Sequence, residues 1–440
     1  MLGYIVFFFY LILFCYFVFI ITKKHGLVQF PILFVIAFIF KVLFGCLYGK
    51  YYTYQIPQAD TWNYFFNGLK LNQSHWKGVF KTPSDGNFNL LSPHSYFNYY
   101  RYLFLDIYSG FCSLLTGGRY YCNVIFYNFS IFVGLLQLYR FLIKFSPAYK
   151  TIFFCILFFF PPFVFWTSGF HRDGLLIAFL GIFLYSMQKC CSMHRLMDIV
   201  LLFLSLALLI FMRFFWGFSA IIIGVLWFIA VKFRNNLRPC PVFTFGGIGG
   251  VIIFALSALA PNGLNFAESL VEKQHAFLAL NGLSELGTSR LSLNPISFVK
   301  VLLEGYNHLL LRPYPREIAG APLYLLAFIE NLFVLLLAGL SFFFVIKREN
   351  RGGTSKPVEI GTKSWDGECN KVVVLSKPEN NVLLFLVILN YSIVGITVPF
   401  LGAIVRYKAP FELLLIILLI QYVPVEFLRK LVPKRIRKYF

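Results

Sequence analysis

The sequence predicts an all-α, polytopic integral membrane protein with about 11 transmembrane helices, plus interfacial or re-entrant helices in its outer loops. Of its 440 residues, 59% are hydrophobic and only 13% are charged, whereas a soluble domain is roughly half apolar and a quarter charged. The mean hydropathy is +0.74. Apolar runs long enough to cross a bilayer recur from end to end, and they are continuous rather than alternating, which favours helices. These observations exclude a soluble enzyme and a disordered chain.

The apolar runs define the expected spans. The first run has no basic segment before it and no small-residue cleavage site after it, so we expect a retained membrane helix and not a signal peptide. The segment 98–117 carries Arg101 and Asp106, and we expect it to lie at the interface or to re-enter without crossing. The expected spans are 4–21, 28–48, 121–143, 151–169, 174–187, 197–212, 216–232, 241–260, 321–346, 381–402 and 408–427.

The distribution of charge predicts the orientation of these spans. The net charge of +21 comes from 39 Lys and Arg against 18 Asp and Glu, and we attribute it to cytoplasmic loops rather than to nucleic-acid binding. Basic residues gather in alternate loops, including a polar linker at 347–380 and the C-terminal tail. The predicted organisation is a main helical block, 1–346, with outer loops 49–120 and 261–320, the cytoplasmic linker 347–380, and a C-terminal two-helix block with a basic cytoplasmic tail, 381–440.

On this topology, polar residues near helix ends collect on the outer side. A lone Arg at a membrane end can be a snorkelling anchor. An Arg-rich rim with few carboxylates also suits phosphate or pyrophosphate recognition through forked, charge-assisted hydrogen bonds. The shared side favours the functional interpretation for the set as a whole. Its members are Asp60, His171, Arg172, Asp173, Arg213, Arg312, Arg316, Glu317, Arg406 and Tyr407.

Two stretches carry the candidate acids. Asp60, in QIPQADTWNYFFNG, opens the first large outer loop, where it suits either a helix N-cap or a general base for an acceptor hydroxyl. The stretch PPFVFWTSGFHRDGLLIAFL places Asp173 at the start of an apolar helix, directly after His171 and Arg172. The alternative is a polar turn neutralised by an Arg–Asp pair. We favour function, because a tight turn between such apolar runs rarely needs all three residues.

Two further motifs, LRPYPRE with Arg312 and Arg316, and VRYKAP with Arg406 and Tyr407, place Arg beside Tyr and Pro. Such a motif can bracket an anionic ring-shaped ligand or anchor the chain in the aromatic belt. No cofactor is predicted. The nine Cys residues show no zinc-type spacing, and no paired-carboxylate motif indicates a divalent metal.

These motifs resemble those of the GT-C superfamily, multi-span glycosyltransferases that use polyprenyl-phosphate-linked sugars. The resemblance implies an acidic residue in the first large outer loop, matched by Asp60, a basic–acidic pair opening a later helix, matched by HRDG, and an Arg-Tyr before the last helices, matched by VRYKAP. The chain departs from the pattern in having two helices before that loop, a solitary acid and short outer loops. The Arg-rich rim is also similar to that of O-antigen and related polysaccharide polymerases, which join lipid-linked glycans.

The resemblance implies an inverting glycosyltransferase of the bacterial cytoplasmic membrane, acting in cell-envelope polysaccharide biosynthesis. Its partners would be membrane lipids, a polyprenyl-phosphate-linked sugar and a glycan, lipid or protein acceptor on the outer face. Asp60 would activate the acceptor hydroxyl, Asp173 would orient Arg172 or bind a sugar hydroxyl, and the Arg rim would hold the donor phosphate. A transporter or flippase of lipid-linked sugars ranks lower, because Lys41 is the one clear interior cation in the sequence and no repeat is visible. A non-catalytic scaffold leaves the outer cluster unexplained.

Overall fold

The computed structural model describes a helical protein. It covers residues 2–24, 31–55, 59–77, 93–193, 195–233, 238–259, 265–280, 284–318, 322–350 and 377–431. The chain forms two compact units, Met1–Ala220 and Ile221–Phe440, and the boundary falls within α11 (Phe214–Lys232). Most of the predicted linker 347–380 and the end of the predicted basic tail lie outside the described residues.

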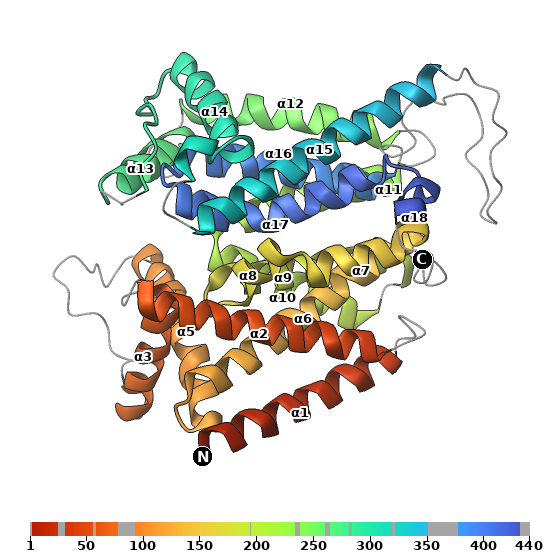
Figure 1. Ribbon diagram of the computed structural model, residues 1–440. Helices are drawn as coiled ribbons and strands as arrows, with labels where there is room; N and C mark the ends of the chain where they lie inside the picture. Colours follow the sequence, from red (N-terminus) through yellow and green to blue (C-terminus); the bar gives the residue numbers. More distant parts are fainter. Residues whose placement is uncertain are drawn as a thin grey trace. The chain divides into compact units, whose positions relative to one another are not determined.

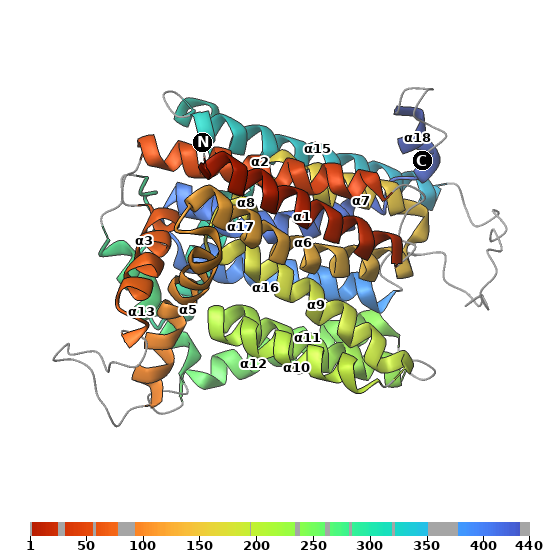
Figure 2. The same ribbon diagram turned by 90° about the horizontal axis from the view of Figure 1, so that it is seen from below.

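The first unit is built around α6 and α9, which pack along one another, with α10 against α9 and α2 against α1, α6 and α8. Figures 1 and 2 both show α3 and α5 lying side by side. The elements of this unit are α1 (Leu2–Lys24), α2 (Ile32–Gln55), α3 (Asp60–Gln73), α5 (Pro93–Thr116), α6 (Tyr120–Phe145), η1 (Pro147–Tyr149), α7 (Lys150–Phe159), α8 (Pro161–Ser168), α9 (Arg172–Met193) and α10 (Leu196–Met212).

Small residues allow the central helices of this unit to approach closely. A Cβ at Gly134 of α6 would lie 2.3 Å from the Cα of Ala178 on α9, and a Cβ at Gly174 would lie 2.4 Å from the carbonyl oxygen of Thr167. Close backbone approach of this kind is how helices pack in a lipid environment. The start of α9 is therefore held tightly against α6 and the end of α8.

The predicted span 151–169 is interrupted. Pro161 and Pro162 open α8, and the chain bends by 47° between the helical segments Pro147–Phe159 and Pro161–Ser168. Proline lacks a backbone N–H and clashes with the preceding turn, so α7 ends before the pair and a new helix begins with it. The bend gives α8 its own direction and places its last residues, Thr167 and Ser168, next to Lys41 of α2.

In the second unit α16 packs against α12, α13, α14 and α17, and α15 packs against α17. The helices expected to form a separate C-terminal block therefore belong to the same unit as the helices between residue 239 and the linker. A single antiparallel bridge joins Glu285 and Phe400. The elements are α12 (Pro239–Ser257), α13 (Phe266–Leu278), α14 (Pro295–Leu310), η2 (Pro315–Glu317), α15 (Pro322–Asn350), α16 (Pro378–Thr397), α17 (Leu401–Ile420) and α18 (Val425–Leu431).

Within the described residues, eight helices are long and apolar enough to cross a membrane, or nine if the bent pair counts as one span. The predicted total of about 11 is not confirmed. Helix α10 has only 17 residues. Helix α17, which runs on through the residues expected to separate the spans 381–402 and 408–427, carries Arg406, Lys408 and Glu412. The apolar part of α5, Leu103–Thr116, is also shorter than a crossing. The protein is therefore a multi-pass membrane protein by its helices, with several shorter helices beside the spans.

Candidate functional site

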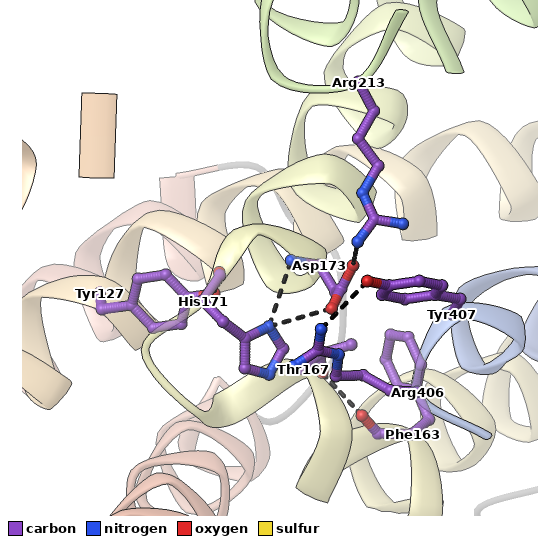
Figure 3. Close-up of polar contacts among 8 residues, drawn as sticks. All are labelled: Tyr127, Phe163, Thr167, His171, Asp173, Arg213, Arg406 and Tyr407. Atoms are coloured by element: carbon purple, nitrogen blue, oxygen red, sulfur yellow. Dashed lines mark hydrogen bonds and ion pairs between the residues drawn. The ribbon is translucent and has the colours of Figure 1, made fainter. Parts of the chain in front are cut away.

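The strongest cluster of predicted site residues lies at the turn between α8 and α9. The Asp173 carboxylate is 2.7 Å from Nη2 of Arg213 and 3.2 Å from Nδ1 of His171. His171 and Asp173 are each 2% exposed, whereas 21% of the Arg213 side chain is exposed. Figure 3 shows Asp173 between the other two side chains. The Asp173 carboxylate thus fixes both the His171 imidazole and the Arg213 guanidinium. Arg213 is the residue that joins α10 to α11.

Polar side chains from α2 and α6 hold the turn in place. Tyr127 donates a hydrogen bond to the carbonyl of His171, and Nδ2 of Asn128 donates to the carbonyl of Ser168 at 3.0 Å. The buried ammonium of Lys41 donates to the hydroxyls of Thr167 at 2.9 Å and Ser168 at 3.1 Å. Buried polar groups are costly unless they are hydrogen-bonded, and a satisfied network is rigid. The turn is therefore pre-organised, as a binding or catalytic site needs to be.

A second acid, Asp106 of α5, belongs to this region. Asn67 of α3 donates to its Oδ2 at 3.4 Å, and its Oδ1 is buried with no hydrogen-bond partner among the described residues. Burial raises the pKa of Asp106 to about 7, although the Asn67 hydrogen bond and the positive charge of Arg172 both act to lower it. A carboxyl group poised near neutrality beside an Arg has the properties of a general acid or base.

Asp60 is exposed and is the first helical residue of α3. The predicted N-cap role is wrong, because the cap residue is Ala59 and it makes no side-chain cap hydrogen bond. A carboxylate in the first turn still interacts favourably with the helix dipole. Asn67, the partner of Asp106, lies two turns further along α3, which is about 10 Å along the axis. The role of Asp60 as a base stays a prediction.

The remaining predicted site residues belong to the second unit. Nε of Arg312 is 3.6 Å from Oε1 of Glu317, and its guanidinium lies 5.2 Å from the centre of the Tyr314 ring. Arg316 is exposed in the 3-10 turn η2.

Arg406 and Tyr407 are consecutive residues of α17. Nη2 of Arg406 donates to the Tyr407 hydroxyl at 3.2 Å (Figure 3). The two residues therefore contact each other and lie within a helix, and their binding of an anionic ligand stays a prediction.

Charged residues inside apolar helices were missed as site residues. Asp106, Glu330, Lys408 and Glu412 were not selected as site residues, although each lies in a largely apolar stretch of the sequence. Lys408 is fully buried, so Lys41 is not the one interior cation. The signal was present, because an ionisable residue within an apolar segment is costly and usually functional.

The described residues contain no group of three or more His, Cys, Asp or Glu side chains that could hold a metal ion. Comparison with protein-family models, with curated proteins and with solved structures found no match for this chain.

Proposed function

We propose that the protein is a membrane glycosyltransferase that moves a sugar from a polyprenyl-phosphate donor to a glycan, lipid or protein acceptor at the outer face of the bacterial cytoplasmic membrane. The observation that supports this proposal best is the pre-organised turn at the start of α9, where Arg172 and Arg213 accompany the buried Asp173. A helix N-terminus with two guanidinium groups suits a phosphate monoanion or diester. The lipid tail of the donor would lie among the apolar helices.

The chemistry requires an anion-stabilising group and a base. Phosphate leaves more readily when donors match the charge that develops on it, and Arg172 and Arg213 are the candidates in the first unit. Asp173 would orient Arg213, which it contacts at 2.7 Å. Asp106, with its pKa raised to about 7 by burial, suits the role of removing the acceptor proton near neutral pH. Asp60 is the alternative base.

Binding of the leaving group tests the proposal directly. Purified full-length protein would be titrated with a polyprenyl phosphate and, as a control ligand, with the same polyprenol lacking phosphate. Arg172→Gln and Arg213→Gln should each weaken phosphate-dependent binding by roughly 10- to 100-fold, the loss expected for a charge-assisted hydrogen bond.

Arg140→Gln is the matched control variant, because Arg140 bonds to Gln137 and lies on the Tyr185 ring, away from the turn. Equal affinity for the two ligands, or equal losses in all three variants, would contradict a phosphate site. Transfer assays with a panel of polyprenyl-phosphate hexoses and pentoses would then identify the sugar. Arg312, Arg316 and Arg406 remain predicted phosphate donors from the second unit, and the same titration tests them.

A transporter of lipid-linked sugars is the second candidate, and one observation favours it. The second unit buries Lys408, Glu412 and Glu330 together, and ionisable residues inside a helical bundle are typical of transport pathways. Vesicles reconstituted with the protein and a fluorescent polyprenyl-phosphate sugar separate the two functions. Transbilayer movement without any transferred product would favour the transporter.

A further inference from the structure

The second unit contains a buried polar cluster that the proposed transfer reaction does not use. Its members come from three helices: Glu330 and Asn331 from α15, Tyr391 from α16, and Lys408 and Glu412 from α17. All are at most 3% exposed, and Lys408 is fully buried. Burying several ionisable groups together is expensive, so their mutual arrangement must offset most of the cost.

The ammonium group of Lys408 is well satisfied. Its Nζ lies 3.0 and 3.2 Å from the two carboxylate oxygens of Glu412, and it donates to the side-chain oxygen of Asn331 and to the carbonyl of Leu309. Asn331 in turn donates to the carbonyl of Arg312 at 2.5 Å. An ammonium group has three N–H donors, and this environment supplies an acceptor for each. The Lys408 side chain is therefore fully hydrogen-bonded and paired with Glu412.

Glu330 is the second acid of the cluster. Both of its carboxylate oxygens are buried and accept no hydrogen bond from a described residue, and the Tyr391 hydroxyl is likewise buried and unsatisfied. The Glu412 carboxyl and the Lys408 ammonium are the charged groups that act on Glu330, and Glu412 also interacts with it side chain to side chain. Ionised carboxylates only accept hydrogen bonds, so Glu330 and Glu412 can bond to each other only when one of them carries a proton.

The charges of the cluster do not balance as they stand. Two carboxylates and one ammonium leave one formal negative charge in a buried site, and an uncompensated buried charge is far more costly than a neutralised one. We propose that Glu330 and Glu412 hold one exchangeable proton between them, which makes this cluster a proton-binding site of the second unit. The other titratable groups around the pair are Lys408 and Tyr391, and Tyr306 of α14 acts on Tyr391 in turn.

The helix that carries the site contains a proline within it. Pro410 lies between Lys408 and Glu412 in the continuous helix α17. It has no N–H for the carbonyl of Arg406 and therefore weakens the helix at that turn. Proline is tolerated in membrane helices where neighbouring groups satisfy the freed carbonyl. Uptake or release of the proton changes the net charge beside this weak point, which links protonation to the conformation of α17.

Counting charges predicts that some variants lose a protonated carboxyl group and that another gains one. Infrared spectra of the full-length protein in lipid vesicles at pH 7 would measure the C=O band of protonated carboxyl groups. The spectrum of the wild type would be subtracted from that of each variant. Glu330→Gln and Glu412→Gln should each remove one protonated carboxyl, because the remaining acid is balanced by Lys408. Lys408→Met should instead add one, because both acids must then be neutral.

Glu304→Gln on α14 is the control, since Glu304 accepts hydrogen bonds from the backbone and hydroxyl of Ser289 instead. It should leave the band unchanged. An unchanged band in both Gln variants of the pair would overturn the proposal, and these two variants suffice if Lys408→Met does not fold. Loss of the wild-type band when sodium chloride replaces choline chloride would assign the site to Na⁺ and also overturn it. Phosphate-lipid binding in the first unit is measured separately, so either proposal can fail alone.

Discussion

The contact between Asp173 and Arg213 should be the strongest polar coupling in the first unit. At the observed N–O separation of 2.7 Å, two unit charges attract by about 6 kcal/mol at an effective dielectric constant of ~20. Desolvation of the buried carboxylate offsets much of this attraction, and water screens the Arg213 side chain, which is 21% exposed. We therefore expect a net coupling energy of about 1.5–3 kcal/mol.

A double-mutant cycle measures this coupling. Asp173→Asn, Arg213→Gln and the double variant would be unfolded by SDS in mixed micelles, with tryptophan fluorescence as the signal. Trp166 on α8 and Trp216 on α11 are both buried, and they lie near Asp173 and Arg213 in the sequence. Their fluorescence therefore reports unfolding of the region around the pair. Each single variant should lower the free energy of unfolding, and the double variant should lower it by less than the sum of the two.

The control cycle uses Lys189 and Asp198, which form a second Lys/Arg–Asp ion pair in the same unit. Their separation is 3.5 Å, and the cation is exposed to a similar extent, at 24%. The longer distance and the point charge of lysine predict a coupling of about 0.2–1 kcal/mol. A coupling for Asp173 and Arg213 at or below that of the control pair would refute the assignment of Asp173 as the organiser of the turn.

Three further predictions follow from the structure and the sequence. Because burial raises the pKa of Asp106 from about 3.8 to about 7 in the folded state, the folded protein binds more protons than the unfolded chain between those values. Stability should therefore fall as pH rises through this window. In thermal unfolding, Asp106→Asn should make the stability depend less on pH. Gly174→Ala should destabilise by roughly 1–3 kcal/mol in the same assay through overpacking against the Thr167 carbonyl. Gly250→Ala, where a Cβ meets nothing within 4 Å, should be neutral or stabilising by up to about 1 kcal/mol. Cysteine labelling in a background without native cysteines should place the segment 347–380 inside the cell, because the basic loops are expected there. Labelling from outside would reverse the predicted topology.

The sequence by itself determined the class of the protein and most of its helices. Continuous apolar runs can satisfy their backbone groups in lipid only as helices, so the positions of α1, α2, α6 and α9 follow from hydropathy. The break at Pro161 is also encoded locally, because proline ends the preceding helix, although 151–169 was predicted as one span. Local rules place Asp173 at the start of α9 as well, since a carboxylate there is stabilised by the helix dipole.

Tertiary structure alone decided which distant residues meet. Arg213 joins Asp173, Asn67 joins Asp106, and Asn331 joins Lys408 through contacts between helices far apart in the sequence. Hydrophobic periodicity does not encode such pairings, because a membrane helix surrounded by lipid has no strongly polar face to mark its neighbours. The same limit explains why α17 was predicted as an ordinary span. The role of the charged residues buried in α17 depends on the helices that pack around it.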